Sequence, residues 1–270
     1  MRRRNTFKRV LFTCLTIVFA VMLGISANRL ISTVLEQRES TRVYDALAEH
    51  VTFVPPILQP GTQHVPPQEG GEAPGEEIAP EPVFPTVDFA ALAEINPNIV
   101  GWLVLEGTVI NYPVVHWRDN DRYLHRLFDG TRNPAGTLFV DSRNAPGFSD
   151  LNNIIHGHHM RDGSMFATLY RFQSQEFFDA HPQMLLMTPE RNYIIKLFAG
   201  YAANIREESW QIDFNSYTEF DQWIRDSIAR SDFTSNVHAG ARDRIMTFST
   251  CTTFSDNARY VVLGKMVPVS

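Results

Sequence analysis

The stretch IMTFSTC (Ile245–Cys251) decides the fold of this chain together with the segment that follows it. A polar loop, TTFSDNA (252–258), leads from it into RYVVLGKM (259–266). Two runs rich in Val, Ile and Phe that are joined by a short polar loop predict neighbouring antiparallel strands. Cys251 and Arg259 flank this loop, so we expect them to face each other at one rim of a sheet.

The same pattern of short apolar runs broken by turn residues fills the chain from about residue 87 onward. Beyond the pair above (244–250 and 260–267), strands are predicted at 109–115, 137–140, 153–156, 184–187 and 193–201. So many strands without alternating long helices favour an antiparallel barrel or a sandwich.

Helices are few, and we expect them at 89–93, 165–172 and 217–230. The last has the strongest pattern. Ser216 can cap its first turn, with Glu219 as the reciprocal partner three positions on. Its apolar face is expected to comprise Tyr217, Phe220, Trp223, Ile224 and Ile228.

The N-terminus reads as a membrane segment. Five of the 24 Lys and Arg lie in residues 1–9, and residues 10–27 are almost all apolar and uncharged. Such a run is just long enough to cross a bilayer, and its basic flank is expected to stay in the cytoplasm, with everything after Asn28 outside. A cleaved secretory signal ending near Ala27 is the alternative. The rest of the chain carries 19 basic against 30 acidic side chains, so nucleic acid is not expected as a partner.

The chain therefore divides into a basic tail (1–9), a transmembrane anchor (10–27), a helical stalk (28–50), a Pro-rich linker (51–85) and a folded domain (86–270). The stalk has enough apolar positions to pack on the domain. The linker is too polar and too rich in proline for a core, and we expect a semi-extended spacer that holds the domain away from the membrane.

The cysteines point to a reactive thiol. Only two exist, and Cys14 lies in the apolar run, so Cys251 is alone in the external part and has no partner there for a disulfide. A cysteine that merely packs in the core is the alternative. Arg259 would favour the thiolate and could hold a carbonyl oxygen as it gains negative charge. Alternatively, Arg259 pairs with Asp256 at the rim.

A second cluster, NNIIHGHHMRDGSMF (152–166), places three histidines on a glycine-bearing turn after a strand. A cysteine nucleophile needs a partner that takes and returns a proton, and imidazole suits that task near neutral pH. A metal site is an alternative, although Met160 and Arg161 stand where a further acid and histidine would continue such a motif. A second alternative is an ordinary surface turn without a catalytic role.

Together these segments resemble class B sortases. Residues 153–166 are similar to that family's histidine motif, 247–251 to its nucleophile motif, and Arg259 with the strand after it to its arginine strand. The resemblance spans about 88–267. It implies a mainly β fold, a closed eight-stranded sortase-type barrel with short helices and one longer inserted helix before the nucleophile strand, which the helix at 217–230 fits. It selects His158, directly after glycine, as catalytic with Cys251 and Arg259.

The resemblance also implies substrate contacts. The segment at 111–124 is similar to a family block whose asparagine and leucine line the peptide groove, which selects Asn120 and Leu124, and Ser249 is selected likewise. Two positions depart from the family pattern. Phe248 replaces the more usual leucine, and Thr252 stands where some members place an acid, which puts substrate preference there in doubt.

The function implied is a membrane-anchored cysteine transpeptidase of Gram-positive bacteria. It would cleave a C-terminal sorting signal of exported proteins through a thioester on Cys251 and transfer them to a cell-wall peptidoglycan amine, with the catalytic domain extracellular. No metal or organic cofactor is expected. Two alternatives stay open at this point: a hydrolytic cysteine peptidase with the same residues, and a non-catalytic wall-binding module.

Overall fold

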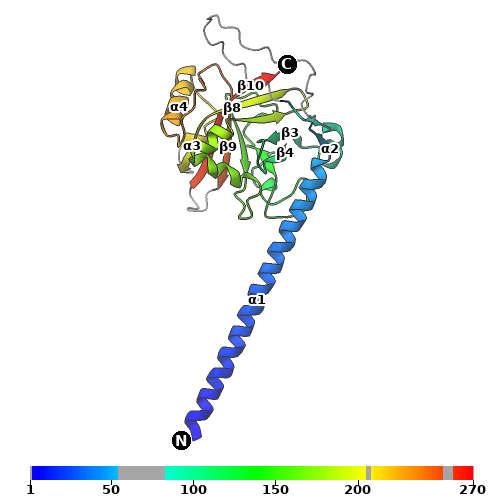
Figure 1. Cartoon of the computed structure of the whole chain (residues 1–270), viewed down its shortest axis with the longest axis vertical. Helices are drawn as coiled ribbons and strands as arrows, with labels where there is room; N and C mark the ends of the chain where they lie inside the picture. Colours follow the sequence, from blue (N-terminus) through cyan, green and yellow to red (C-terminus); the bar gives the residue numbers. More distant parts are fainter. Residues whose placement is uncertain (1, 54–82, 205–207, 252–257, 270) are drawn as a thin grey trace, which may run out of the picture.

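Eight strands form a closed barrel in the order β10-β8-β7-β3-β4-β5-β6-β9 (Figure 1). The computed structural model describes residues 2–53, 83–204, 208–251 and 258–269. Closure pairs each barrel strand on both sides, as the resemblance implied. The barrel strands are β3 (Ile99–Val104), β4 (Asn111–His116), β5 (Leu138–Val140), β6 (Asn152–Gly157), β7 (Gln183–Met187), β8 (Asn192–Asn204), β9 (Ile245–Cys251) and β10 (Ala258–Val269).

The barrel is mixed, so the expectation of a wholly antiparallel arrangement is wrong. β4 pairs with β5, and β6 with β9, in parallel. Parallel neighbours need long crossover connections. Residues 117–137 with the short helix η1 (Arg122–Leu124) provide the first, and the chain from β7 to α4 lies within the second. Sequence patterns predicted seven of these strands and missed β3, an unbroken apolar run that carries no strand-like alternation.

The inserted helix α4 (Tyr217–Ala229) lies between β8 and β9, where it was predicted. Its N-cap is Ser216, whose side chain accepts the Glu219 N–H at 3.1 Å, while the Glu219 carboxylate accepts from the backbone of Asn215 instead of that of Ser216. The buried face packs on β8 and β10. Tyr217 and Ile228 are 66% and 43% exposed, so the buried face is narrower than predicted.

The smaller helices lie around the barrel. Those predicted at 89–93 and 165–172 are confirmed, the second as a 3₁₀ helix, whereas α3 and the short helix η3 escaped prediction. These elements are α2 (Phe89–Ile95), η2 (Phe166–Gln173), α3 (Gln175–Ala180) and η3 (Glu208–Trp210).

The predicted anchor and stalk form one unbroken helix, α1 (Arg2–Ala48), which projects from the barrel and touches it only at its C-terminal end (Figure 1). There Val43, Tyr44 and Leu47 are buried. The Asn133 side-chain amide donates to the Glu36 carbonyl at 2.9 Å. The end of the stalk thus packs on the domain.

The Pro-rich stretch begins and ends at the same place. β1 (Val51–Thr52) pairs with β2 (Thr86–Val87), and the Asp88 N–H donates to the His50 carbonyl at 3.0 Å. Residues 54–82, which carry most of the predicted spacer, lie outside the described residues. The role of this stretch as a spacer stays a prediction.

Candidate active site

Strand register places Cys251 opposite Arg259. β9 and β10 are antiparallel, and Arg259 and Cys251 are Cα partners at the end of the ladder. The prediction drawn from the two runs and their loop is confirmed. The alternative partner of Arg259, Asp256, lies outside the described residues.

The other neighbour of β9 brings His158 to the same place. β6 runs parallel to β9, and their ladder ends with Gly157 opposite Thr250, so the chain continues from this last pair to His158 on one strand end and to Cys251 on the other. A side chain at Gly157 would come within 2.5 Å of Leu138 and 2.7 Å of Phe166, so only glycine fits there. Cys251 therefore lies between His158 on one side and Arg259 on the other.

His158 is held by the η1 segment. Its Nε2 lies 2.7 Å from the Leu124 carbonyl oxygen. Because a carbonyl only accepts, Nε2 carries the hydrogen and Nδ1 is the basic nitrogen. Burial lowers the pKa of His158, the Leu124 carbonyl partly opposes this, and the nearby charges of His125 and Arg259 lower the pKa further. The imidazole is thus predominantly neutral at pH 7.

The other two histidines of the turn have different surroundings. His156 Nε2 lies 2.9 Å from Asp141, and the His159 ring packs edge-on against Tyr170 with centroids 5.9 Å apart. Across the described residues, no group of three or more His, Cys, Asp or Glu side chains gathers as a metal ion would require.

The three predicted substrate contacts have different surroundings in the fold. Leu124 contacts His158 through its carbonyl. Asn120 accepts the Ser142 N–H through Oδ1 at 2.7 Å. Ser249, two positions before Cys251 on β9, is buried, and its hydroxyl accepts from Trp210 Nε1 at 2.9 Å.

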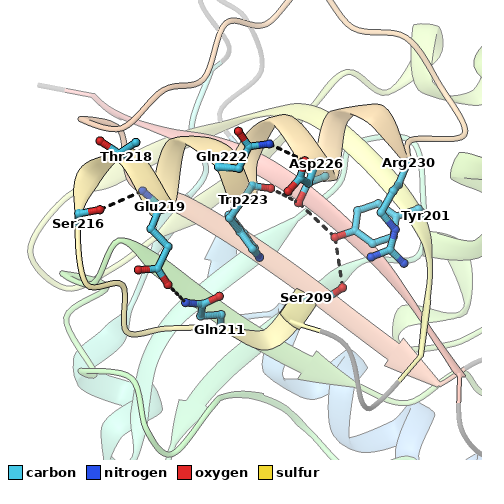
Figure 2. A pocket seen from close by; sticks show the side chains of 11 residues that line it. Tyr201, Ser209, Gln211, Ser216, Thr218, Glu219, Gln222, Trp223, Asp226 and Arg230 are labelled. Atoms are coloured by element: carbon cyan, nitrogen blue, oxygen red, sulfur yellow. Dashed lines mark hydrogen bonds between the residues drawn. The ribbon is translucent and has the colours of Figure 1, made fainter.

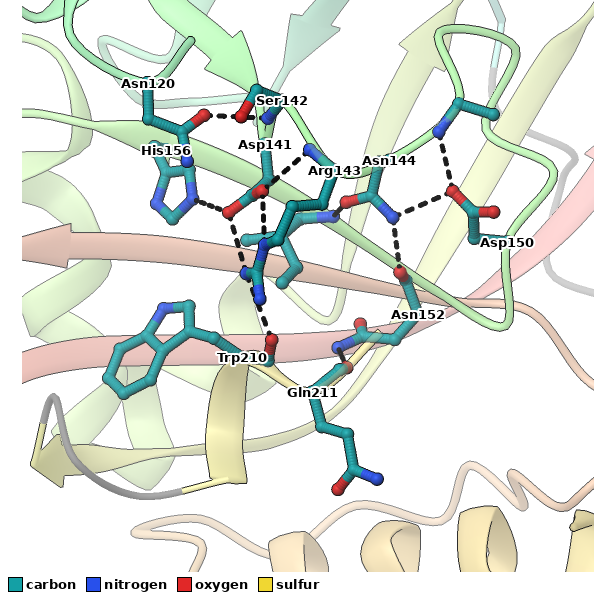
Figure 3. Close-up of polar contacts among 12 residues, drawn as sticks. Asn120, Asp141, Ser142, Arg143, Asn144, Asp150, Asn152, His156, Trp210 and Gln211 are labelled. Atoms are coloured by element: carbon teal, nitrogen blue, oxygen red, sulfur yellow. Dashed lines mark hydrogen bonds and ion pairs between the residues drawn. The ribbon is translucent and has the colours of Figure 1, made fainter. Parts of the chain in front are cut away.

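Figure 3 shows a network around Asp141 that supports this wall of the site. Arg143 donates to Asp141 through Nε at 2.8 Å and to the Trp210 carbonyl through Nη2 at 3.2 Å. Burial alone would raise the pKa of Asp141, but the bonds from His156 and Arg143 outweigh it and hold the pKa far below its usual range. The anionic Asp141 therefore ties β5, β6 and η3 together, and η3 carries the Trp210 that contacts Ser249.

A cavity of about 630 Å³ lies under α4, where Ser209 and Gln211 on either side of Trp210 line part of it (Figure 2). Its wall includes Tyr201, whose hydroxyl lies 3.3 Å from Ser209 and Ser227. The guanidinium of Arg230 covers the Tyr201 ring at 4.3 Å. Among the predicted site residues whose side chains the structure describes, none lines this cavity.

Comparison with known proteins agrees with this geometry. Residues 103–267 match the sortase domain family. Sortase B of Listeria monocytogenes is 38% identical over 178 residues, 65% of this chain and 72% of that protein. The chain belongs to the class B sortases. Sortase B of Staphylococcus aureus is 28% identical over 260 residues, 96% of this chain and 97% of that protein.

Solved class B sortases share the fold. A Staphylococcus aureus sortase B–substrate complex superposes with a TM-score of 0.65 and 33% identity, over 67% of this chain and 85% of that one. Bacillus anthracis sortase B in complex with AAEK1 superposes with a TM-score of 0.62 and 35% identity, over 67% of this chain and 84% of that one. This sortase is accordingly a cysteine transpeptidase, which speaks against the non-catalytic wall-binding module.

Sequence reasoning did not single out the residues that support the sortase site. Asp141 offered one signal, since it is an acid at the end of a buried strand. Trp210 offered none, because it lies 39 positions from Ser249 and reaches it only through the fold. The role of Arg143 likewise depends on its contact with Trp210.

Proposed function

We propose that this sortase cleaves a C-terminal sorting signal of exported proteins and transfers them to a cell-wall peptidoglycan amine. The observation that carries the proposal is the register of three strands, which sets Cys251 between His158 and Arg259. A nucleophile, a proton carrier and a cation on neighbouring strand ends are the groups that acyl transfer through cysteine needs.

In the first step, the Cys251 thiolate attacks a backbone carbonyl of the substrate. Arg259 stabilises the oxyanion or fixes the substrate backbone. In the reacting fraction of the enzyme, the proton shared by Cys251 and His158 is on Nδ1 of His158, which gives it to the leaving amine, so that the C–N bond breaks and a thioester remains. An imidazolium of lowered pKa is a strong acid for this purpose.

In the second step, a cell-wall amine attacks the thioester and loses its proton to neutral His158, which releases the product and the thiolate. The pair of Cys251 and His158 thus begins and ends with one shared proton. No metal or organic cofactor enters either step. Relatives described as a sortase B–substrate complex and as sortase B complexed with triglycine support a peptide donor and a short peptide acceptor.

We assign Asn120, Leu124 and Ser249 to the substrate groove. All three lie on segments that border His158 or Cys251, as described above. Ser249 and Cys251 occupy positions on one face of β9, because successive residues of a strand alternate between its two faces.

The enzyme is proposed to be anchored through α1, with the N-terminus in the cytoplasm and the barrel outside. The helix has an 18-residue window of mean hydropathy 1.9 that is 0% buried, and basic residues precede it. Cleavage after residue 27 would still leave the packed end of α1 on the barrel. The intact mass of the mature protein, isolated from its native membrane, distinguishes the anchor from a cleaved signal.

The test uses the full chain in lipid nanodiscs with a library of fluorogenic sorting-type peptides, followed by mass spectrometry with and without a wall-peptide amine. We expect a thioester adduct that passes to the amine and that is lost in Cys251→Ala. Product formed only with water in the presence of the amine would instead indicate a hydrolytic peptidase. A folded enzyme that forms no adduct with any peptide would contradict the proposed donor.

A further inference from the structure

The C-terminal end of α1 inserts one aromatic side chain into the barrel. Tyr44 is 8% exposed, and its hydroxyl donates to the Gly136 carbonyl and lies 3.2 Å from Thr137 Oγ1. These two hydrogen-bonding partners lie more than 90 residues away in the sequence. A helix that only suspended the enzyme from a membrane would not need such a contact.

From Gly136, a short path leads to the imidazole of His158. Gly136 has φ of +61°, and a Cβ there would lie 2.5 Å from the Tyr123 oxygen and 2.8 Å from the Leu124 oxygen, so its backbone packs directly on both carbonyls. The Thr137 N–H also donates to the Tyr123 carbonyl at 2.9 Å. The Leu124 carbonyl then accepts from His158 Nε2 at 2.7 Å.

A second path leads from the Tyr44 ring to the other side of the histidine turn. The ring meets Tyr112 edge to face, with centroids 5.1 Å apart. The Tyr112 hydroxyl accepts the Met165 N–H at 3.2 Å. Met165 has φ of +56°, which is uncommon for a residue with a side chain, and it forms a bridge with His159. The turn that carries His158 is therefore closed at a residue that Tyr112 holds.

We infer that the end of α1 belongs to the active-site scaffold, and that Tyr44 is a positioning residue for His158. The inference rests on the catalytic role proposed for His158. Tyr44 does not touch the reacting atoms. It fixes the two segments that hold the imidazole, one through its hydroxyl and one through its ring, and small displacements of a catalytic group are costly in rate.

The contact of Tyr44 with the segments around His158 affects more than the stability of the fold. Beside Tyr44, a cavity of about 350 Å³, whose wall includes Asp45, Thr108 and Ser164, separates α1 from the histidine turn. The packing beside Tyr44 is therefore open, and Tyr44 contacts Tyr112 at the edge of this cavity. Through it, the helix proposed to cross the membrane also orients the catalytic histidine of the barrel outside.

The test is Tyr44→Phe in the full chain in nanodiscs, which removes the hydroxyl and keeps the ring. We expect kcat for the thioester-forming step to fall about tenfold with KM within about twofold, because geometry and not binding is disturbed. The His158 pKa, followed by NMR of histidine-labelled protein and assigned with His158→Asn, should fall, since the Leu124 carbonyl that raises it is less well placed. Cys251, which shares a proton with His158, and the nearby charges of His125 and Arg259 are the same in the variant as in the wild type.

Tyr201→Phe is the matched control, because it removes another buried tyrosine hydroxyl, which bonds Ser209 and Ser227 beneath α4. It should change neither kcat nor the His158 pKa. If Tyr44→Phe does not fold, Tyr112→Phe tests the second path and should lower kcat in the same direction while the barrel stays folded.

A folded Tyr44→Phe enzyme with unchanged kcat and an unchanged His158 pKa would overturn the inference, as would an equal effect of Tyr201→Phe. The proposed chemistry is tested separately with His158→Ala. If that variant stays active while Tyr44→Phe still shifts the His158 pKa, the catalytic role of His158 is wrong, although the structural linkage stands.

Discussion

Two regions meet at the active site, and they are built differently. The β9–β10 hairpin holds Cys251 and Arg259 through one local ladder, in which they are partners across a short loop. The histidine turn is held by η1, by Tyr112 and by the end of α1, which come from distant parts of the chain. A change in the hairpin should therefore affect the chemistry directly, whereas a change around the turn should act through geometry and stability.

The largest effect should come from Arg259→Lys. Lysine keeps the charge but loses the planar fork of donors, so the developing oxyanion or the substrate backbone is held less well. We expect kcat/KM for peptide cleavage to fall about a hundredfold with little change in melting temperature. Arg242→Lys, an exposed loop residue, is the control. Wild-type activity in Arg259→Lys would mean that the hairpin supplies only the thiol.

Gly157→Ala should damage the turn through packing. The new methyl would lie 2.5 Å from Leu138 and 2.7 Å from Phe166, so neighbours must move. We expect a loss of about 2 kcal/mol in the free energy of unfolding, measured by urea denaturation. Gly147→Ala, where a Cβ meets nothing within 4 Å, should be close to neutral. Equal stability of the two variants would show that the strands adjust without cost.

Asp141→Asn should weaken the wall that carries Trp210. Asparagine keeps one acceptor oxygen but replaces the other with an NH2 donor and carries no charge, so Arg143 and His156 lose their shared carboxylate. We expect a loss of about 2 kcal/mol at pH 7, since Arg143 is partly exposed. The pKa of Asp141 is lowered, so its stabilisation is complete above its ordinary pKa of 3.8 and is lost as the pH falls below that value.

The difference in unfolding free energy between wild type and Asp141→Asn should therefore shrink as the pH falls below 3.8. Asp179→Asn, an exposed carboxylate on α3, should show no such pattern. If the difference in unfolding free energy between wild type and Asp141→Asn did not depend on pH, the loss of stability would come from packing and not from the charge of Asp141.

The smallest effect should come from His125→Asn. The rings of His125 and His158 lie 6.2 Å apart, and the charge of His125 lowers the His158 pKa. Its removal should raise that pKa, observed by NMR titration, and change kcat at pH 7 by less than about twofold, because His125 is exposed and screened. His238→Asn is the distant control. A fall in the pKa would mean that His125 acts on His158 by some means other than charge repulsion.

Local patterns predicted a good part of the fold. Ser216 marked the start of α4, and the two runs around the loop at 252–258 predicted the register of Cys251 with Arg259. Both depend on residues close in sequence. β3 was missed because a strand buried on both faces has no alternation to detect, and the parallel pairs were missed because a local pattern carries no information on the partner strand.

The site shows the same division. Among the three histidines of the turn, the residues alone did not choose His158, and the family resemblance did. In the fold, the parallel ladder of β6 and β9 ends at Gly157 and Thr250, so His158 is the histidine that directly follows this ladder, as Cys251 does on β9. The supporting contacts of Trp210 and Tyr44 span tens of residues and were not predicted at all.

By itself, the sequence determined the hairpin with its thiol and cation, the capped helix before it and the apolar N-terminal helix, because each follows from neighbouring residues and their periodicity. Only the tertiary structure decided which histidine follows the β6–β9 ladder, that β1 pairs with β2, and that Tyr44 at the end of α1 contacts Tyr112, which in turn bonds the histidine turn. These depend on contacts between distant segments, which form only when the closed barrel brings their strand ends together.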